Sequence, residues 1–311
     1  MPPKKKTKKK KGVISEDAIE ITVPVSDYIL DKYLTTKLQL PREHLSPSSI
    51  TTYQNCAYQF EDQYINGNRG GDSVESMEGT THHSAFEYNN LYKVKTGKDR
   101  PVKKVIEFLC DELHDNWKTV EEKYGHKERD LIIRGKKIQE RYHQIFAHRL
   151  IPRLVEQEFV IKIGPVKILC YSDVIGELKP AVGRGPAKNV ACDYKVSSRS
   201  KSDKDVAHSI QLTTYGICDM AERVCDVMSD VGFVTCVKSK MPTIEWQSAT
   251  MHQGRIDWFV RTVLSVANAI SRGAFPPCDP TENGLCSEKW CNAWDKCLGS
   301  CKRRKERVEN D

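Results

Sequence analysis

Two short stretches, "YSDVI" at residues 171–175 and "CDYKVSS" at residues 192–198, decide the expected fold of this chain. In this part of the sequence apolar and polar residues tend to alternate with a period of two, which predicts β-strands. Because alternate residues of a strand share a face, Asp193 and Lys195 should point the same way. Tyr194 should then lie on the opposite face of the sheet.

The two stretches bring carboxylates together if their strands pair, because Asp173 then comes near Asp193. Two converging carboxylates make a hard-oxygen site of the kind that Mg²⁺ and Mn²⁺ prefer. A lysine beside them, here Lys195, can orient a metal-bound water or neutralise charge that develops on a phosphate. On its own an Asp-x-Lys strand is more often an exposed ion pair, so the metal site needs support from elsewhere in the chain.

Two predicted helices supply that support, since residues four apart lie on one face of a helix. The residues with this spacing are Gly79, His83 and Glu87 in "EGTTHHSAFEY", and Gln211 and Tyr215 in "SIQLTTY". His82 stands directly before His83, so the sequence leaves open which of the two histidines takes part.

The order of these motifs resembles that of the PD-(D/E)XK nuclease superfamily. "LSPSSITTYQNC" at 45–56 is followed by Gly-x-x-x-His, then Asp, then Asp-x-Lys, then Gln-x-x-x-Tyr. More narrowly, the chain resembles the RecB-like exonucleases, including phage-type enzymes and the iron–sulfur nucleases of CRISPR adaptation. The resemblance spans about residues 45–300. It implies a ββαβ core that hydrolyses DNA phosphodiesters with a divalent metal, Mg²⁺ or Mn²⁺.

The resemblance also implies roles for individual residues. It makes His83, Asp173 and Asp193 metal ligands and Lys195 the catalytic lysine. Gln211 and Tyr215 support the catalytic site from the following helix. Glu87 and Glu156 are weaker candidates, as accessory acids. The family often has Cys-Pro where this chain has Cys56-Ala57, a departure that leaves the cysteine itself in place.

A cysteine-rich stretch, "GLCSEKWCNAWDKCLGSC", occupies residues 284–301. Four thiolates can hold a [4Fe–4S] cluster or a structural Zn²⁺. In several branches of the family an iron–sulfur cluster joins one N-terminal cysteine to three C-terminal ones. The matching residues here are Cys56, Cys286, Cys291 and Cys297, which leaves Cys278 and Cys301 spare. The main alternative is zinc held by Cys286, Cys291, Cys297 and Cys301.

The remaining pattern predicts an α/β protein with a restriction-endonuclease-like mixed central sheet flanked by helices. Helices are expected at about 45–65, 76–92, 205–224 and 255–273, and strands from about Glu156 onward. We expect a Lys-rich tail and linker at 1–23 and one RecB-like nuclease domain at 24–311. Within that domain we place a helical insertion at about 93–155, the nuclease core at about 156–275 and the Cys-rich segment at 278–301.

The net charge of +7 is concentrated at one end, because seven lysines lie between residues 4 and 11. Such a block is expected to be disordered. It fits an arm that attracts DNA phosphates, a solubilising tail or a nuclear localisation signal. We expect no secretory signal and no membrane span, because no apolar segment of sufficient length follows the charged start. The expected location is the cytoplasm (the host cytoplasm for a phage protein), with the nucleus as the alternative.

Taken together, the sequence predicts a metal-dependent DNA exonuclease with a structural [4Fe–4S] cluster. Its partner would be single-stranded DNA or DNA with free ends, in a setting such as recombination or repair. One alternative is a structure-selective DNA endonuclease of the same superfamily. The other is a non-catalytic nucleic-acid-binding protein whose C-terminal part is stapled by zinc.

Overall fold

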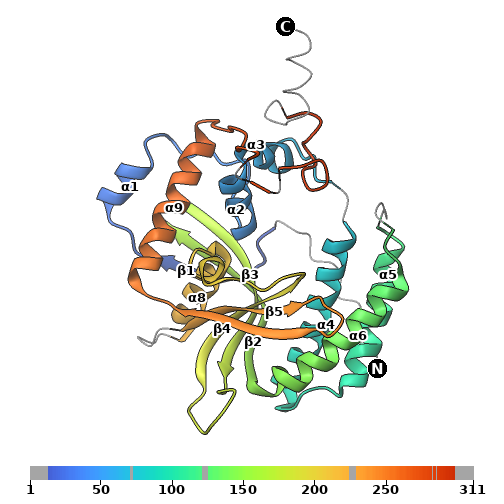
Figure 1. The fold of residues 1–311 in the computed structure, drawn as a ribbon. Coiled ribbons are helices and arrows are strands. Elements are labelled where there is room, and N and C mark those ends of the chain that lie inside the picture. Colours follow the sequence, from blue (N-terminus) through green and yellow to red (C-terminus); the bar gives the residue numbers. More distant parts are fainter. Residues whose placement is uncertain are drawn as a thin grey trace.

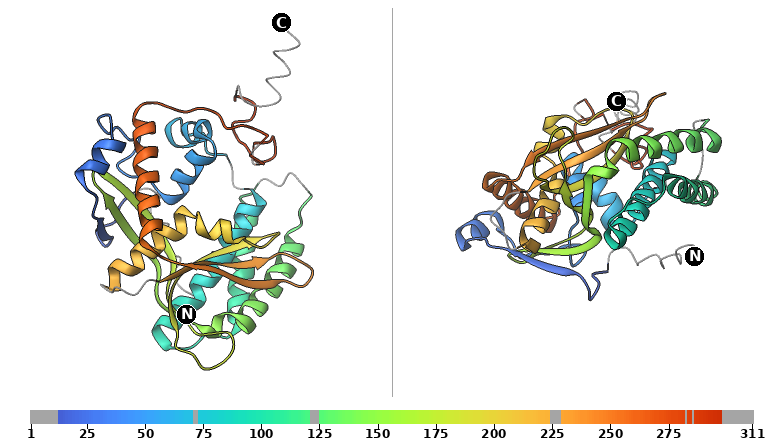
Figure 2. Two further views of the ribbon diagram at one scale, coloured as in Figure 1. Left: turned by 60° about the vertical axis from the view of Figure 1, so that its left-hand side comes forward. Right: turned by 90° about the horizontal axis from the view of Figure 1, so that it is seen from below.

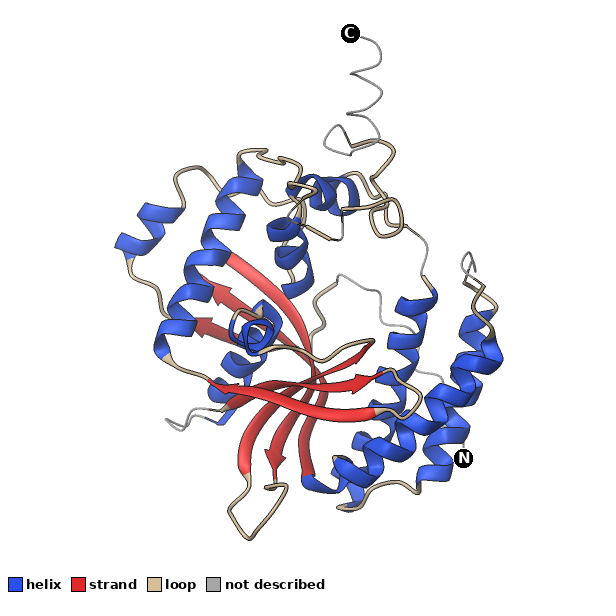
Figure 3. Ribbon diagram, viewed as in Figure 1, coloured by secondary structure: helices blue, strands red, loops and turns tan. Residues whose placement is uncertain are grey.

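A mixed sheet forms the centre of the protein in the computed structural model (Figures 1 and 3). The structure describes residues 13–70, 73–120, 125–223, 229–281, 283–284 and 286–297. Within them the sheet has six strands in the order β1-β2-β3-β4-β5-β6. The strands are β1 Ile19–Val23, β2 Leu150–Ile163, β3 Val166–Leu178, β4 Lys188–Ser197, β5 Asp230–Val237 and β6 Thr243–Thr250. β1–β2 and β4–β5 are parallel pairs, and the other neighbours are antiparallel.

Helices cover both faces of the sheet (Figures 1 and 2). The α-helices are α1 Asp27–Tyr33, α2 Pro47–Asn55, α3 Ala57–Phe60, α4 Val74–Thr96, α5 Val102–Trp117, α6 Glu128–Ile145, α7 Asp203–Ala207, α8 Ile210–Arg223 and α9 Gln253–Ser271. A short π-helix, Glu61–Ile65, follows α3, and a 3₁₀ turn, Ala147–Arg149, precedes β2.

Two apolar cores fix these layers. The first core lies between the sheet and helices α2, α8 and α9, with Ile168 and Phe259 among its fully buried residues. The second core lies on the other face, against α4 and α6, and contains Phe86, Tyr142 and Tyr194. The period-two pattern of β4 is confirmed, because Tyr194 packs into the second core while Asp193 and Lys195 face the other way and meet each other.

The expected mixed α/β fold is confirmed, with corrections at several boundaries. Ile19–Val23, which we assigned to the tail, is a strand because its apolar residues pack beside β2. β2 begins at Leu150, so the helical insertion ends before the predicted residue 155. The helix predicted at 205–224 is two helices, α7 and α8, that separate near His208. The first twelve residues, including the lysine block, lie outside the described residues.

The helix predicted at 45–65 begins as expected but is interrupted. Ser46 and Ser49 form a reciprocal capping box with Pro47 at the first helical position. At Cys56 the backbone becomes extended, with φ −163° and ψ 107°. The chain resumes as α3 and then the π-helix. The interruption turns Cys56 toward the segment that follows α9. In that segment, the peptide N–H of Cys278 donates to the Sγ atom of Cys56.

Candidate active site

The candidate active site lies where β3 and β4 separate. The pairing of the two strands ends at Val174 and Cys192. Asp173 and Asp193 are the next residues on the two strands, so their carboxylates lie at the mouth of the fork. The Tyr194 peptide N–H bridges the fork by donating to Asp173 Oδ2 at 2.9 Å.

The Asp193 carboxylate is fully buried and poorly satisfied. Lys195 Nζ lies 2.6 Å from its Oδ2 atom, but neither carboxylate oxygen has a hydrogen bond of good geometry. The contact is therefore a charge pair rather than an aligned hydrogen bond. Burial raises the pKa of Asp193 to about 6, although the Lys195 ammonium opposes that shift. Lys195 balances the charge of this carboxylate, but its oxygens accept no aligned hydrogen bond, and a metal cation could occupy those acceptor positions.

Asp173 is paired with a histidine of α4. His83 Nδ1 lies 3.1 Å from Asp173 Oδ2. Burial alone would lower the pKa of His83, but the Asp173 carboxylate outweighs burial and raises it to about 9. Burial likewise works against the charge of Asp173, yet His83 and Lys195 hold the pKa of its carboxyl below the usual range. The pair is thus an imidazolium and a carboxylate at neutral pH.

The structure distinguishes the two adjacent histidines. His82 is fully buried and points toward α6, where its Nδ1 atom is 3.2 Å from Gln139 Nε2. Burial lowers the pKa of His82 to about 4, so it stays neutral in the core. His83 is the histidine that reaches Asp173. In the sequence, the four-residue spacing of Gly79, His83 and Glu87 favours His83 as the site histidine, but it does not exclude a role for His82.

Helix α8 connects the two carboxylate strands through a chain of polar contacts. Tyr215 donates its hydroxyl to Asp173 Oδ1 at 3.3 Å and accepts from Gln211 Nε2 at 2.9 Å. Gln211 Oε1 in turn accepts from Lys195 Nζ at 3.4 Å. The structure therefore brings together all the residues predicted for the catalytic site: His83, Asp173, Asp193, Lys195, Gln211 and Tyr215.

A strained residue on β2 lies opposite Asp173. Glu156 has φ +50°, and the residues on either side of it pair with those on either side of Asp173. Cys170 faces the first core and Val174 the second, although they are four residues apart, so the alternation of β3 is interrupted beside Asp173. A left-handed non-glycine residue costs about 1–3 kcal/mol. Glu87, the other accessory acid, lies one turn after His83 on α4.

The carboxylates do not form a finished metal cage. Within the described part of the chain, no group of three or more His, Cys, Asp or Glu side chains is arranged to hold a metal ion. His83 is instead paired with Asp173, and Lys195 with Asp193. The donor set still fits Mg²⁺, which keeps several waters and commonly takes only one or two protein carboxylates plus substrate phosphate.

The cysteines converge at a second place, beside α3 at the top of Figure 1. Cys56, Cys286, Cys291 and Cys297 line one small cavity, as the resemblance implies, and Cys278 lines it as well. The iron–sulfur interpretation of the sequence leaves Cys278 spare, whereas the structure places it beside the four predicted ligands. The other cysteine taken as spare, Cys301, lies outside the described residues.

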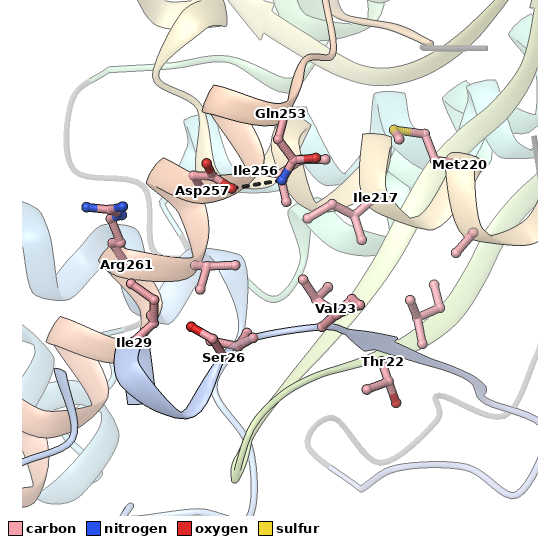
Figure 4. A pocket seen from close by; sticks show the side chains of 15 residues that line it. Thr22, Val23, Ser26, Ile29, Ile217, Met220, Gln253, Ile256, Asp257 and Arg261 are labelled. Carbon is pink, nitrogen blue, oxygen red and sulfur yellow. Dashed lines mark hydrogen bonds between the residues drawn. The ribbon is translucent and has the colours of Figure 1, made fainter. Parts of the chain in front are cut away.

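A larger cavity, of about 560 Å³, lies away from both places, between β1, α1, α8 and α9 (Figure 4). Apolar side chains such as Ile29, Ile217 and Met220 line it, and Gln253 donates to Asp257 at 2.8 Å at its edge. None of the candidate catalytic residues lines this cavity. In the described residues, no helix is long and apolar enough to cross a membrane.

Comparison with known proteins identifies the superfamily of the chain. The model of the PD-(D/E)XK nuclease superfamily matches residues 44–298. No curated protein matches the chain. A crystal structure from Eubacterium rectale described as "Putative exonuclease" is similar with a TM-score of 0.44 and 12% sequence identity, over 83% of this chain and 91% of that one. Since the family model covers most of the chain, the protein belongs to the PD-(D/E)XK nuclease superfamily.

Proposed function

We propose that this nuclease is a metal-dependent DNA exonuclease whose active centre is the fork between β3 and β4. The observation that carries the proposal is the buried Asp193 carboxylate, which has no well-aligned hydrogen bond and lies in one network with Asp173 and Lys195. A fold rarely keeps such a group for stability alone, because the cost of burying the charges of Asp193 and Lys195 can exceed what their pairing returns. Perturbed carboxylates are typical of functional sites.

The residues of the fork have separable roles. Asp173 and Asp193 would hold the divalent metal, which supplies a more acidic bound water and neutralises charge on the scissile phosphate. Lys195 has a raised pKa despite its burial, because both carboxylates stabilise its charge. It therefore acts as a cation toward the phosphate or the attacking water, not as a base. Gln211 holds the Lys195 ammonium, and Tyr215 holds Asp173.

His83 has a conditional role as a ligand. Its Nδ1 atom is committed to Asp173 while the imidazole is protonated. A histidine binds a metal only as the neutral imidazole. Metal binding would therefore release the His83 proton, and Asp173 would exchange its imidazolium partner for the metal.

The exonuclease assignment rests on the resemblance to RecB-like enzymes, so the substrate panel is its test. The purified chain is incubated with linear and covalently closed circular DNA, each single- and double-stranded, in Mg²⁺, Mn²⁺ or chelator. We expect degradation of linear DNA only, and none in chelator. Cleavage of closed circles would instead assign the fork to an endonuclease. No cleavage of any substrate with either metal would overturn the proposal.

We further propose that the cysteine site holds a [4Fe–4S] cluster that fastens the end of α2 to the segment after α9. Cys56 lines the same cavity as the C-terminal cysteines. The cluster hypothesis requires Cys56 at this place, whereas a zinc ion held only by C-terminal cysteines does not. The thiolates of a cluster bind separate iron atoms, so they need not converge on one point. Anaerobically purified protein should be brown and contain iron and sulfide in comparable amounts. Colourless protein with stoichiometric zinc would refute the cluster.

The domain organisation is proposed on the same basis. One nuclease unit, residues 24–311, would contain α5 and α6 as its helical insertion and the cysteine site as the fastening of its two ends. The lysine block would add non-specific attraction to the DNA backbone, which should weaken steeply with salt.

A further inference from the structure

Five cysteines, rather than four, surround the cavity beside α3. A [4Fe–4S] cluster or a structural zinc ion takes four protein thiolates. One thiol is therefore surplus to the centre, and the thiol that the resemblance leaves spare is Cys278. Its surroundings decide whether it only packs there or can take part in metal binding.

Cys278 is held in place by specific polar contacts. Its peptide N–H donates to Cys56 Sγ at 3.4 Å. Its own sulfur accepts from Asn283 Nδ2 at 3.6 Å, and the same Nδ2 atom donates to the Asn55 carbonyl at 2.9 Å. Asn283 thus ties the Cys278 sulfur to the end of α2. N–H donors directed at sulfur are the kind of outer contact that stabilises thiolate ligands.

The neighbours of Cys278 are themselves predicted ligands. The side chain of Cys278 is hydrogen-bonded to those of Cys56 and Cys286. Cys291 lines the same cavity, with the thiols of Cys286, Cys56 and Cys297 as its neighbours. Cys56 and Cys286 therefore neighbour both of the other two thiols. Cys278 and Cys286 also belong to one segment of turns, which contains no helix or strand in its described residues.

We propose that Cys278 is a reserve ligand of the metal centre and can take the place of Cys286. Without Cys286, the thiols of Cys56, Cys291 and Cys297 remain, and Cys278 already lies against Cys56. Cys286, like Cys56, is hydrogen-bonded to Cys278, so Cys278 already lies beside the position that the loss of Cys286 would leave open. This inference rests on the proposal that the cysteine site binds a metal, whether as an iron–sulfur cluster or as zinc.

The test compares metal content in the full chain, purified anaerobically, for a series of variants. Cys278→Ser and Cys286→Ser should each keep most of the wild-type metal. The double variant Cys278→Ser/Cys286→Ser should lose it, because three of the five cysteines described around the cavity then remain. Cys110→Ser, on α5 away from the cavity, is the matched control and should retain all of it. The reserve role is overturned if Cys286→Ser alone loses as much metal as the double variant.

A second measurement keeps this inference separate from the identity of the metal. Iron, sulfide and zinc analysis of the wild-type protein tests the proposed cluster, while the pattern among variants tests Cys278 for either metal. Metal-free protein is also oxidised with diamide, and its disulfides are mapped by mass spectrometry. We expect Cys278 in a bridge with Cys56 or Cys286. If Cys278 enters no bridge while the other cysteines of the cavity do, the convergence is wrong. That result overturns the inference even for a protein that retains no metal.

Discussion

The carboxylate fork and the cysteine site both join residues that are far apart in the sequence, but they are built differently. The fork stands on two strands and two long helices, and its charged groups are paired with one another before any metal arrives. The cysteine site stands on the break between α2 and α3 and on a segment of turns, and its thiols mainly meet one another. The fork is therefore positioned by the fold, whereas the cysteine site stands on irregular segments that the proposed metal would fasten together.

This difference predicts separable effects. Changes at the fork should remove activity and leave the fold and the cysteine-bound metal intact. Changes at the cysteine site should remove metal and stability first, and activity only as a consequence.

The largest effect is expected for Lys195→Ala. The variant loses the cation that faces the phosphate, and cleavage of linear DNA should fall by about 10²–10³-fold. Metal at the cysteine site and the melting temperature should stay close to wild type. Lys103→Ala, an exposed lysine of α5, is the matched control. Cleavage within a few fold of wild type would remove Lys195 from the mechanism.

The two histidines offer a matched pair one residue apart. His83→Gln should weaken Mn²⁺ binding at the fork by about 10–100-fold, the range found when an oriented metal-site group is lost. His82→Gln should leave Mn²⁺ binding unchanged and lower stability, because His82 is fully buried beside Gln139. Calorimetric titration of Mn²⁺ checks both. The reverse pattern would exchange the roles that we assign.

At the other region, Cys56→Ser should bleach the protein and destabilise it. A cross-link that closes so long a loop contributes on the order of 3 kcal/mol. Its loss should lower the melting temperature by roughly 5–10 °C. Cleavage at low temperature should fall less than in Lys195→Ala. Unchanged metal content in Cys56→Ser would show that Cys56 is not a ligand and would favour a zinc site made of C-terminal cysteines only.

The fork should make a distinct contribution to the pH dependence of stability. The folded pKa of His83 is about 9, above its ordinary value of 6.5. Its pair with Asp173 therefore stabilises the metal-free protein fully below pH 6.5, and that contribution is lost as the pH rises through 9. Thermal melts in chelator should show a decline between these values that His83→Gln lacks. Equal declines in both proteins would argue against the ion pair.

The smallest effect is expected for Tyr215→Phe. The variant loses one hydrogen bond to Asp173, worth about 1 kcal/mol, and leaves Gln211 Nε2 without its acceptor, while Gln211 Oε1 still accepts from Lys195. Metal affinity at the fork should fall by about fivefold. Titration with Mn²⁺ measures it, and no change in affinity would make Tyr215 a packing residue only.

Much of the fork could be predicted from the sequence, because strand alternation and helical spacing are local rules. They place Asp193 beside Lys195, and Gln211 one turn before Tyr215. The choice of His83 over His82 depends on which side of α4 meets the sheet, which local spacing does not specify. The left-handed Glu156 and the interrupted alternation beside Asp173 arise from pairing between strands and leave no mark in the residue pattern.

The cysteine site was less predictable for a physical reason. Its residues belong to turns, where no periodicity records the direction of a side chain. At the break, Cys56 contacts a segment more than 200 residues later in the sequence. The helical spacing of apolar residues continues across Cys56, so the sequence pattern does not indicate the break. Cys278 likewise belongs to the site because of tertiary contacts, which its position in the sequence does not indicate.

The central claim is that Asp173 and Asp193 bind the metal with which this nuclease cleaves DNA. Its most direct test is Mn²⁺ binding followed by electron paramagnetic resonance, with cleavage of linear DNA measured on the same samples of wild type and Asp193→Asn. We predict that the substitution, which removes one charge and hardly changes shape, abolishes both Mn²⁺ binding and cleavage in a folded protein that keeps its cysteine-bound metal. Wild-type cleavage by Asp193→Asn would contradict the account.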